Sequence, residues 1–323
     1  MLQTVWGWQP ALYLFLGGMG AGAFIMAAVL FLIDRTRHRL IVCVSMWAAT
    51  VSLGVGLMLL LSELIHPLRG MLMWSAFDHF TSWMTYGAWG AFGAVAVFAI
   101  SAVLATPPAS KWLAAHWKWY VKRGAGLRRV LAIVGIVLSA FVAVYTGMLL
   151  MDSRGVPLWD TLLLPALFTV SAFDTGVALV EVISVVLGKR DRLAPKARSL
   201  MERIVVTLVV LEVIVLAVFL ATMLGADAAT AAGATAAQSA TMLYSGVLAP
   251  YFWGMVVACG LAVPLVMAIA GLALHKQKDG AKDAVMAVGA IGALVGGCEL
   301  RFLILAAGVH APLLATTVMS LIG

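Results

Sequence analysis

The sequence predicts an all-α, polytopic membrane protein, and its composition and the length of its apolar runs carry that prediction. Of 323 residues, 63% are hydrophobic and 11% are charged, with a mean hydropathy of +1.06. Soluble domains are about half apolar and about a quarter charged. Eight apolar runs each reach at least ~18 residues, the length at which a helix begins to span a bilayer. The runs lack the strict alternation of barrel strands, so helices are the structure that satisfies the backbone in lipid.

The eight expected helices follow one another along the whole chain. They cover residues 11–33, 40–65, 83–105, 127–151, 158–187, 203–224, 246–274 and 284–308. Between the sixth and seventh, an Ala/Thr/Gly-rich segment at 225–245 is expected to form an outer loop or a short helix at the membrane surface. We expect two four-helix bundles, residues 1–152 and residues 153–323, which meet at the short turn of residues 151–159.

Lysine and arginine define the expected orientation. Of the 21 basic residues, eighteen fall in the loops on one side of the eight helices. They are Arg35, Arg37, Arg39, Lys111, Lys118, Lys122, Arg123, Arg128, Arg129, Lys189, Arg190, Arg192, Lys196, Arg198, Arg203, Lys276, Lys278 and Lys282. By the positive-inside rule this side is cytoplasmic, so both termini and the 66–82 loop are expected outside. The net charge of +7 follows from this asymmetry, and no nucleic-acid partner is needed to explain it.

Polar side chains gather where the second and fourth expected helices reach the outer surface. They are Glu63, His66, Arg69, Asp78, His79, Tyr145 and Asp152. Glu63 and His66 are three residues apart and therefore share one helix face. A quinone needs partners for its two oxygens, a group that exchanges a proton near neutral pH, and apolar walls, and this cluster offers all three. The alternative is a solvated loop with charges at the helix ends.

Four glycines, Gly17, Gly18, Gly20 and Gly22, lie in the outer half of the first expected helix. Small residues let two membrane helices approach closely, which is the first interpretation of this run. The second interpretation is a bare surface on which a flat ring lies. Both interpretations are open at this stage.

A second polar group lies deeper in the membrane. It comprises Asp174, Glu181, Glu212, Glu299 and Arg301. Each ionisable group inside a span costs at least ~2.5 kcal/mol on insertion, so each is a candidate functional residue. Asp174 and Glu181 are seven residues apart and share a helix face, ~10 Å apart along the axis. The group is interpreted either as a proton path across the bilayer or as buried pairs that fix helix packing.

No haem and no other tightly bound metal are expected. A haem held by two histidines needs both imidazoles at one depth inside the bundle, whereas all six histidines fall at the edges of the expected helices. The alternative is a haem between His66 and His310 at the outer edge. The three cysteines, Cys43, Cys259 and Cys298, form no CxxC pattern. They are expected to be small buried hydrophobic residues rather than ligands of zinc or of an iron–sulfur cluster.

Several longer motifs run in order through nearly the whole chain. They are "WGWQPALYLFLGGMGAGAF", "LIHPLRGMLMW", "TSWMTYGAWG", "YTGMLL", "VPLWDTLLLPALFTVSAFDTGVAL" and "ELRFLILAAGVH". Together they resemble the NrfD/PsrC family, the integral membrane subunits of polysulfide-reductase-type respiratory complexes. The "TSWMTYGAW" stretch and the Tyr-Thr-Gly that ends the fourth helix are the more specific of these motifs.

The resemblance implies a haem-free quinone-binding subunit in the bacterial inner membrane, with periplasmic termini. It implies two partners, a four-cluster iron–sulfur subunit on the outer face and, beyond it, a molybdopterin catalytic subunit. Menaquinone or ubiquinone is then the cofactor of this protein, while clusters and molybdopterin lie in the partners. The residues expected to act on the quinone are His66, Glu63 and Tyr145. Those expected to contact the quinone or the partner are Gly17, Gly18, Gly20, Gly22, Arg69, Asp78, His79 and Asp152.

One position departs from the family pattern. The second helix ends in "ELIHP", where the family pattern has an acidic residue, a small residue and then Arg-Pro. His66 takes the place of that arginine, so the donors around the quinone are expected to differ.

We therefore expect a membrane anchor that exchanges electrons with quinone and completes a multi-subunit oxidoreductase whose terminal substrate is transformed in a partner. Proton translocation is an expected addition to this role. One alternative is a proton-coupled secondary transporter with Asp174, Glu181, Glu212 and Arg301 as its ion path. The other is a passive anchor, for which His66→Ala leaves quinol oxidation intact.

Overall fold

The computed structural model describes residues 6–34, 37–62, 83–153, 155–273 and 279–311, and within them the regular structure is helical. Eight helices in this part are long and apolar enough to cross a membrane. They are α1 (Trp8–Ile33), α2 (Arg39–Ser62), α4 (Trp83–Ala105), α6 (Lys118–Met151), α7 (Leu163–Val186), α8 (Pro195–Leu224), the continuous run α10 (Ala249–Tyr251), η2 (Phe252–Ala262) and α11 (Val263–Ala273), and α12 (Asp279–Ala306). The predicted all-α membrane fold with eight spans is confirmed.

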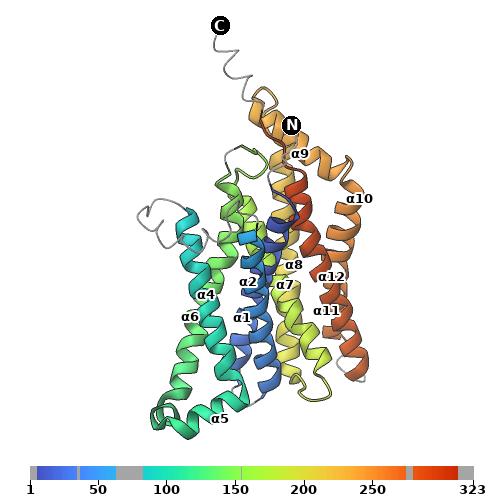
Figure 1. Ribbon diagram of the computed structural model, residues 1–323. Helices are drawn as coiled ribbons and strands as arrows, with labels where there is room; N and C mark the ends of the chain where they lie inside the picture. Colours follow the sequence, from blue (N-terminus) through green and yellow to red (C-terminus); the bar gives the residue numbers. More distant parts are fainter. Residues whose placement is uncertain (1–5, 35–36, 63–82, 154, 274–278, 312–323) are drawn as a thin grey trace.

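Two short helices lie at opposite ends of the bundle. They are α5 (Pro107–His116) and α9 (Ala231–Tyr244), the latter within the segment expected to be an outer loop or surface helix (Figure 1). Helix α5 has no buried residue, and Trp112 within it and Trp117 after it are each 57% exposed. Aromatic side chains of this kind suit the boundary between lipid and water.

The helix starts differ from the expected ones where charged residues begin or precede a span. Helices α6 and α8 begin at Lys118 and Pro195, about three turns and two turns before the apolar runs that predicted them. Their basic first turns extend beyond the apolar core while remaining helical. Helix α7 instead begins at Leu163, five residues later than expected, because Pro165 is tolerated only in a first helical turn.

Helix α1 is the centre of the assembly. It contacts α2, α6, α7 and α12, while α2 and α6 each also contact α4. Helices α7, α8, α11 and α12 pack in a second ring, which joins the first mainly where α1 meets α7. The boundary between residues 1–152 and 153–323 stays a prediction.

The contact between α1 and α7 brings two backbones together at Gly22 and Gly176. A Cβ added to Gly22 would collide with the carbonyl of Ala172, and one added to Gly176 would collide with the backbone of Gly22. Membrane helices rely on such small residues because lipid tails are as apolar as leucine, so association depends on close van der Waals packing.

Aromatic rings fill glycine gaps in the first four spans. Phe24 of α1 lies over Gly135 of α6, and its ring stacks on Phe98 of α4 with centroids 4.0 Å apart. A Cβ at Gly135 would take the space of the Phe24 ring. The Phe24 ring thus connects α1 to both α4 and α6.

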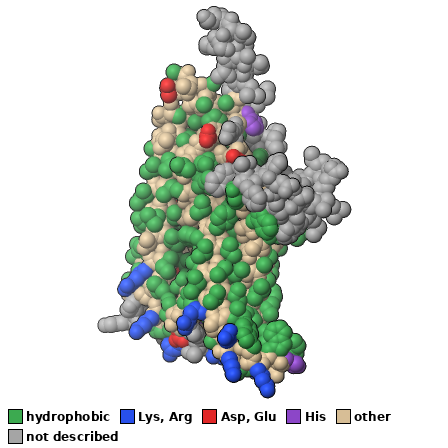
Figure 2. Space-filling view, turned by 90° about the vertical axis from the view of Figure 1, so that its left-hand side faces the viewer, with side chains coloured by type: hydrophobic (Ala, Val, Ile, Leu, Met, Phe, Trp, Pro, Cys, Tyr) green, Lys and Arg blue, Asp and Glu red, His purple; other side chains and the backbone are tan. Residues whose placement is uncertain are grey.

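Basic side chains gather at one end of the molecule, and the acidic side chains seen near the opposite end are few (Figure 2). At the basic end, Asp191 accepts hydrogen bonds from the backbone N–H groups of Leu40 (2.8 Å) and Ile41 (3.1 Å). This carboxylate from the α7–α8 connection caps the start of α2 and favours it through the helix dipole. His38, the residue before α2, has a backbone φ of 59°, and this left-handed conformation turns the chain into the helix.

Candidate functional site

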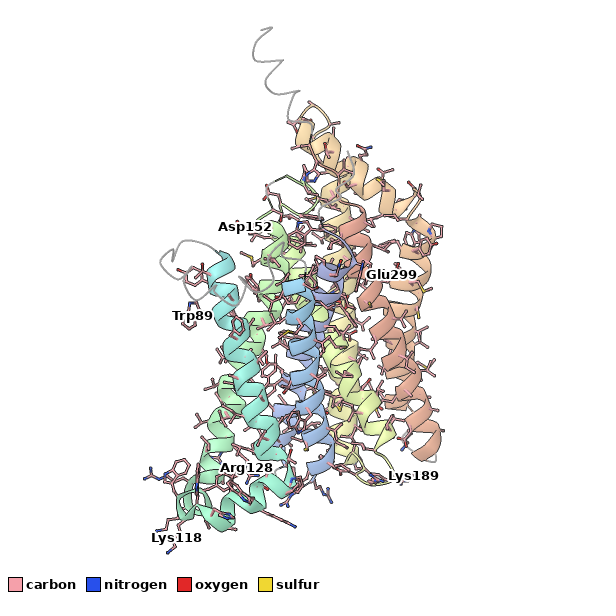
Figure 3. The ribbon with its side chains drawn as sticks, viewed as in Figure 1. Trp89, Lys118, Arg128, Asp152, Lys189 and Glu299 are labelled. Atoms are coloured by element: carbon pink, nitrogen blue, oxygen red, sulfur yellow. The ribbon has the colours of Figure 1, made fainter. Side chains whose placement is uncertain are left out.

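Five residues of the expected outer cluster, Glu63, His66, Arg69, Asp78 and His79, lie outside the described residues. Their roles stay predictions. Tyr145 and Asp152 are described. Tyr145 lies in the last two turns of α6, and Asp152 follows its last residue at the end opposite the basic loops (Figure 3). Asp152 is exposed and close enough to Tyr145 to interact with it electrostatically.

Tyr145 is buried between helices, with 5% of its surface exposed. Its ring stacks beside that of Phe141, one turn earlier, with centroids 6.1 Å apart. Both rings rest on α4, where a Cβ at Gly87 would collide with Tyr145 and a Cβ at Gly90 would collide with Phe141. The i, i+3 spacing of the glycines matches the i, i+4 spacing of the rings, so α4 forms a groove for them.

The three residues of the Tyr-Thr-Gly motif each meet a different helix. Tyr145 lies against α4, whereas Thr146 is 3.8 Å from the position of a Cβ on Gly17 in α1. A Cβ at Gly147 would collide with Pro165 at the start of α7. The motif is therefore the junction at which α6 is held by three neighbours, and this fixes the direction of the Tyr145 phenol.

A second buried phenol, Tyr13 of α1, lies near the Tyr-Thr-Gly junction and was not identified from the sequence. It is 1% exposed and interacts electrostatically with Tyr145. Its ring lies 3.6 Å from the position of a Cβ on Gly17, whose other neighbours are Leu53 and Thr146 at ordinary contact distance. Tyr13, Leu53 and Thr146 thus surround the missing side chain of Gly17.

The other glycines of the run are used for helix contact. A Cβ at Gly18 would lie 3.0 Å from Cβ of Ala172, and one at Gly20 would lie 2.9 Å from the carbonyl oxygen of Ala49. Gly22 makes the backbone contact with α7. Close packing accounts for these three positions, whereas at Gly17 a Cβ would meet only ordinary van der Waals neighbours.

Arg301 is fully buried at the junction of α12, α7 and α1. It donates to Ser171 Oγ at 2.6 Å, to the carbonyl oxygen of Gly297 at 2.7 Å and to that of Phe168 at 3.3 Å. Its guanidinium lies 5.1 Å from the centroid of the Phe168 ring. Its Nη2 approaches within 3.7 Å of the position of a Cβ on Gly18, so Arg301 reaches the glycine run from the C-terminal half.

Two buried carboxyl groups, Glu212 of α8 and Asp174 of α7, face the same junction. Both interact electrostatically with Arg301, and Glu212 is hydrogen-bonded to Ser171. Asp174 Oδ1 is buried and has no hydrogen-bond partner among the described residues. Arg301 and Glu212 are thus linked through Ser171.

The helix segment beside this network is a π-helix, η2. It runs into Pro264, which has no N–H and clashes with the carbonyl four residues earlier in an α-helix, so a wider turn relieves the clash. Its Gly260 packs against the backbone of Gly296 in α12, and both line the small space around Asp174 and Glu212.

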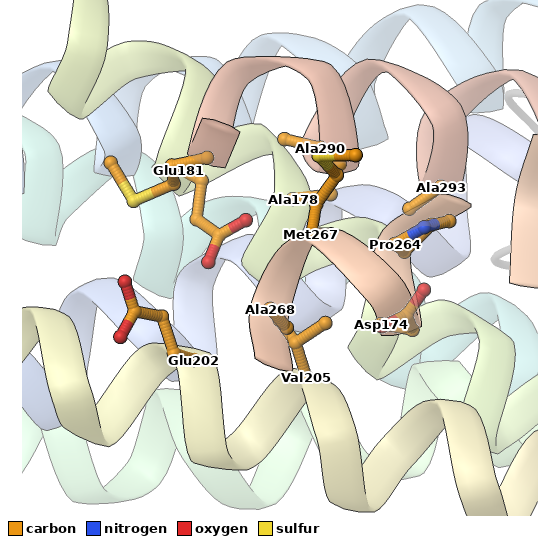
Figure 4. A pocket seen from close by; sticks show the side chains of 12 residues that line it. Asp174, Ala178, Glu181, Glu202, Val205, Pro264, Met267, Ala268, Ala290 and Ala293 are labelled. Atoms are coloured by element: carbon orange, nitrogen blue, oxygen red, sulfur yellow. The ribbon is translucent and has the colours of Figure 1, made fainter. Parts of the chain in front are cut away.

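A narrow internal cavity extends from Asp174 towards the basic end. It has a volume of about 10 Å³, close to the ~10–15 Å³ that one water needs. Figure 4 shows the carboxyl groups of Glu181 and Glu202 pointing towards each other at one end of the cavity, with Asp174 at the other. Glu202 is 5% exposed and was not identified from the sequence.

Glu202 also lines a second, larger cavity of about 330 Å³ at the basic end. Arg198 and Asp283, which form an ion pair, lie on its wall together with Lys282. Gly271 leaves room for the Glu202 carboxylate, because a Cβ there would lie 2.6 Å from its Oε1. The two cavities therefore share one carboxyl group at their boundary.

Glu299 differs from the other expected deep residues. It is half-buried near the end of the bundle opposite the basic loops (Figure 3), and it lines neither cavity. Beyond Arg301, the buried Trp159 donates from Nε1 to the carbonyl oxygen of Ile304 at 3.0 Å and covers this end of α12. Among the described residues, no group of three His, Cys, Asp or Glu side chains is placed to hold a metal ion.

Comparison with known proteins decides the family. The family model described as polysulphide reductase, NrfD matches residues 1–312. The chain belongs to the NrfD polysulphide reductase family. The C subunit of polysulfide reductase from Wolinella succinogenes is 29% identical over 312 residues, covering 94% of each protein. Protein NrfD of Escherichia coli K12 is 28% identical over 324 residues, covering 95% of each protein.

Membership of the NrfD family and eight apolar helices make this protein a multi-pass integral membrane protein. The match runs through both the Tyr145 junction and the Arg301 network. The NrfD resemblance inferred from the motifs is therefore confirmed over nearly the whole chain.

Proposed function

We propose that this NrfD protein is the quinone-reactive membrane subunit of a respiratory oxidoreductase. It exchanges electrons between the quinone pool and an iron–sulfur subunit on its outer face, and a molybdopterin subunit acts on the terminal substrate. The observation that carries the proposal is the pair of buried phenols, Tyr13 of α1 and Tyr145 of α6, which interact electrostatically at the Tyr-Thr-Gly junction. The names of the two relatives, a polysulfide reductase subunit and an NrfD protein, support the same role.

In the proposal, the hydroxyl group of Tyr145 is a hydrogen-bond partner for a quinone oxygen. The neighbouring ring of Phe141 is an apolar wall for the quinone ring. A bound quinol, either menaquinol or ubiquinol, supplies two electrons and two protons. Glu63 and His66 follow directly on the end of α2 in the sequence, and in the proposal they accept the protons and release them outside. Because a histidine titrates near neutral pH, His66 is suited to that exchange.

The proposal extends to proton translocation through the C-terminal half. Glu202, Glu181 and Asp174 form a file that starts at the basic-end cavity and is bridged by space for about one water. From Asp174 the file continues to the Glu212–Ser171–Arg301 network. By the positive-inside rule the basic end is cytoplasmic, so the file opens to the cytoplasm and its protons enter there.

Arg301 connects the two proposed activities. Its guanidinium borders Gly18, the residue after Gly17 in the glycine run, and it also interacts with Glu212 and Asp174. In the proposal, a change of charge at the quinone acts on this buried cation, which holds the end of the acid file. Low dielectric between buried groups strengthens such coupling.

A proton-coupled secondary transporter is a second candidate, and the π-helix beside the buried acids favours it. π-Helical segments are frequent at functional sites, and charged residues within membrane spans mark ion pathways. The transporter requires substrate counterflow by the isolated protein and no response to quinone. The passive anchor requires that changes at Tyr145 and His66 leave quinol oxidation intact.

Purification from the native membrane tests the proposal. Iron–sulfur and molybdenum subunits together with bound menaquinone or ubiquinone are expected to accompany the protein. In that complex, Tyr145→Phe is expected to slow quinol oxidation while leaving reduction of the terminal substrate by an artificial electron donor unchanged. A protein that purifies alone without quinone, or a Tyr145→Phe complex with full quinol oxidation, argues against the proposal.

A further inference from the structure

A cavity of about 340 Å³ lies at the basic end of the first four spans, away from the acid file. It is formed by α1, α2, α4, α5 and α6, and its size is within the ~300–1,000 Å³ of small-ligand pockets. Neither the phenol site nor the carboxyl file uses it, so the proposed function leaves it unexplained.

Four cationic side chains line this cavity. They are Arg37, Arg39, Lys111 and Arg128, and the residues lining it include no Asp or Glu. The nearby Asp34 accepts a hydrogen bond from the backbone N–H of Arg37 but lies outside the lining. Like charges that converge on one space repel each other, so this arrangement favours an anion between them.

Arg128 is the most enclosed of the four cations. It is half-buried, and its Nε is buried without a hydrogen-bond partner among the described residues. A guanidinium recognises a phosphate through parallel N–H groups, and an unmet buried N–H costs free energy. The side chain is therefore prepared for an acceptor that the protein itself does not supply.

The inner wall of the same cavity is apolar, because Phe31, Val42 and Met46 line it. A free phosphate gains nothing from contact with an apolar wall. A molecule with a phosphate head and a hydrocarbon tail contacts both the cations and the apolar wall. Helix α5 forms part of the rim, and its exposed Trp112 suits the level of the lipid headgroups. The cavity thus lies at the depth of a phospholipid headgroup.

We propose that this cavity binds one anionic phospholipid, with its phosphate between Arg128, Lys111 and Arg39 and its tail along Phe31 and Met46. Basic pockets between membrane helices on the cytoplasmic side are a recognised kind of headgroup site. The inference is independent of the quinone site, since it uses the opposite end of the bundle.

The experiment uses the full-length protein, stripped of lipid in detergent and placed in nanodiscs of phosphatidylcholine. Phosphatidylglycerol is titrated in, and bound lipid is counted by native mass spectrometry. Saturation at one retained phosphatidylglycerol is expected for the unaltered protein. The double variant Lys111→Gln/Arg128→Gln is expected to bind roughly 30-fold more weakly, about fivefold for each cation removed. The matched control Lys122→Gln/Arg129→Gln changes two exposed cations of α6 that do not line the cavity, and it is expected to stay within about twofold.

Several outcomes overturn the proposal. One is equal retention of phosphatidylglycerol and phosphatidylcholine by the unaltered protein, and another is an equal loss in the control. A third is displacement of the lipid by inorganic phosphate at matched concentration, which assigns the site to a free anion. The titration of the unaltered protein decides the lipid preference even when the double variant fails to fold. The single variant Arg39→Gln then tests the contribution of one cation to lipid binding.

Discussion

Replacing Gly87 by Ala is expected to disable the phenol site while leaving the fold in place. The new Cβ would overlap the Tyr145 ring, and normal carbon–carbon contact of ~3.5–4.0 Å is restored only when that ring moves by roughly 2 Å. Overpacking costs about 1–3 kcal/mol, and the exchange of glycine for alanine in a helix returns about 1 kcal/mol. The net loss of stability is therefore about 0–2 kcal/mol.

The functional effect is expected to be larger than the loss of stability. A displacement of about 1 Å in a reacting group can reduce a rate about 100-fold, so quinol oxidation by the complex should fall by at least about that factor. The matched control is Gly93→Ala on the same helix, because its Cβ would meet only Leu138 at 4.0 Å. Both variants are compared by thermal unfolding in detergent and by quinol oxidation with an artificial acceptor.

Equal rates for the two alanine variants would refute the reasoning. If both variants keep full activity, the position of Tyr145 does not matter for quinol oxidation. If both lose activity equally, the effect belongs to α4 in general and not to the overlap with the ring. A third variant, Gly90→Ala, overlaps Phe141 in place of Tyr145 and is expected to give an intermediate loss.

Three further predictions concern other parts of the protein. Glu202→Gln is expected to abolish proton uptake from the basic side during turnover, since the amide cannot pass a proton between the two cavities. Proton uptake is measured with pH-sensitive dyes in proteoliposomes, and the variant Asp227→Asn, at an exposed residue, is the control. Arg301→Gln is expected to lower the free energy of unfolding by about 3–5 kcal/mol, because Glu212 and Asp174 lose their buried cation. Thermal unfolding of this variant is compared with that of Arg203→Gln, which changes an exposed arginine. Equal melting temperatures of the two variants contradict the prediction. Asp191→Ala removes the acceptor for two amides at the start of α2 and should cost about 1 kcal/mol; the exposed Asp160→Ala should leave the melting temperature unchanged.

The eight spans were predictable because length and hydrophobicity alone decide whether a helix crosses lipid. Their starts were less predictable, since a helix continues beyond the apolar core wherever its backbone bonds allow. Glu202 illustrates the consequence. It lies among Lys196, Arg198 and Arg203 in a stretch that reads as a loop, yet α8 runs through that stretch and turns Glu202 inwards.

The candidate site was predictable only in part. Asp174 and Glu212 stand out because a carboxyl group within an apolar run is rare. Tyr13 does not stand out, because a lone phenol in an apolar helix carries no spacing signal. The role of the glycine run was also undecided from sequence. Gly22 of this run packs against Gly176, which is 154 positions away along the sequence, and only the fold brings the two residues together.

The close crossing of α1 and α7 has a consequence for the order in which the protein is made. Helix α1 is synthesised before α7, the helix that covers Gly18 and Gly22, which follows about 130 residues later. At ~5–20 residues per second, α1 waits in the bilayer for roughly 6–26 s with that small-residue surface uncovered. Such surfaces associate readily with other membrane helices. The packing of the first four spans is therefore complete only once α7 has been made. A nascent polypeptide released before α7 leaves the small-residue surface of α1 exposed to other membrane helices.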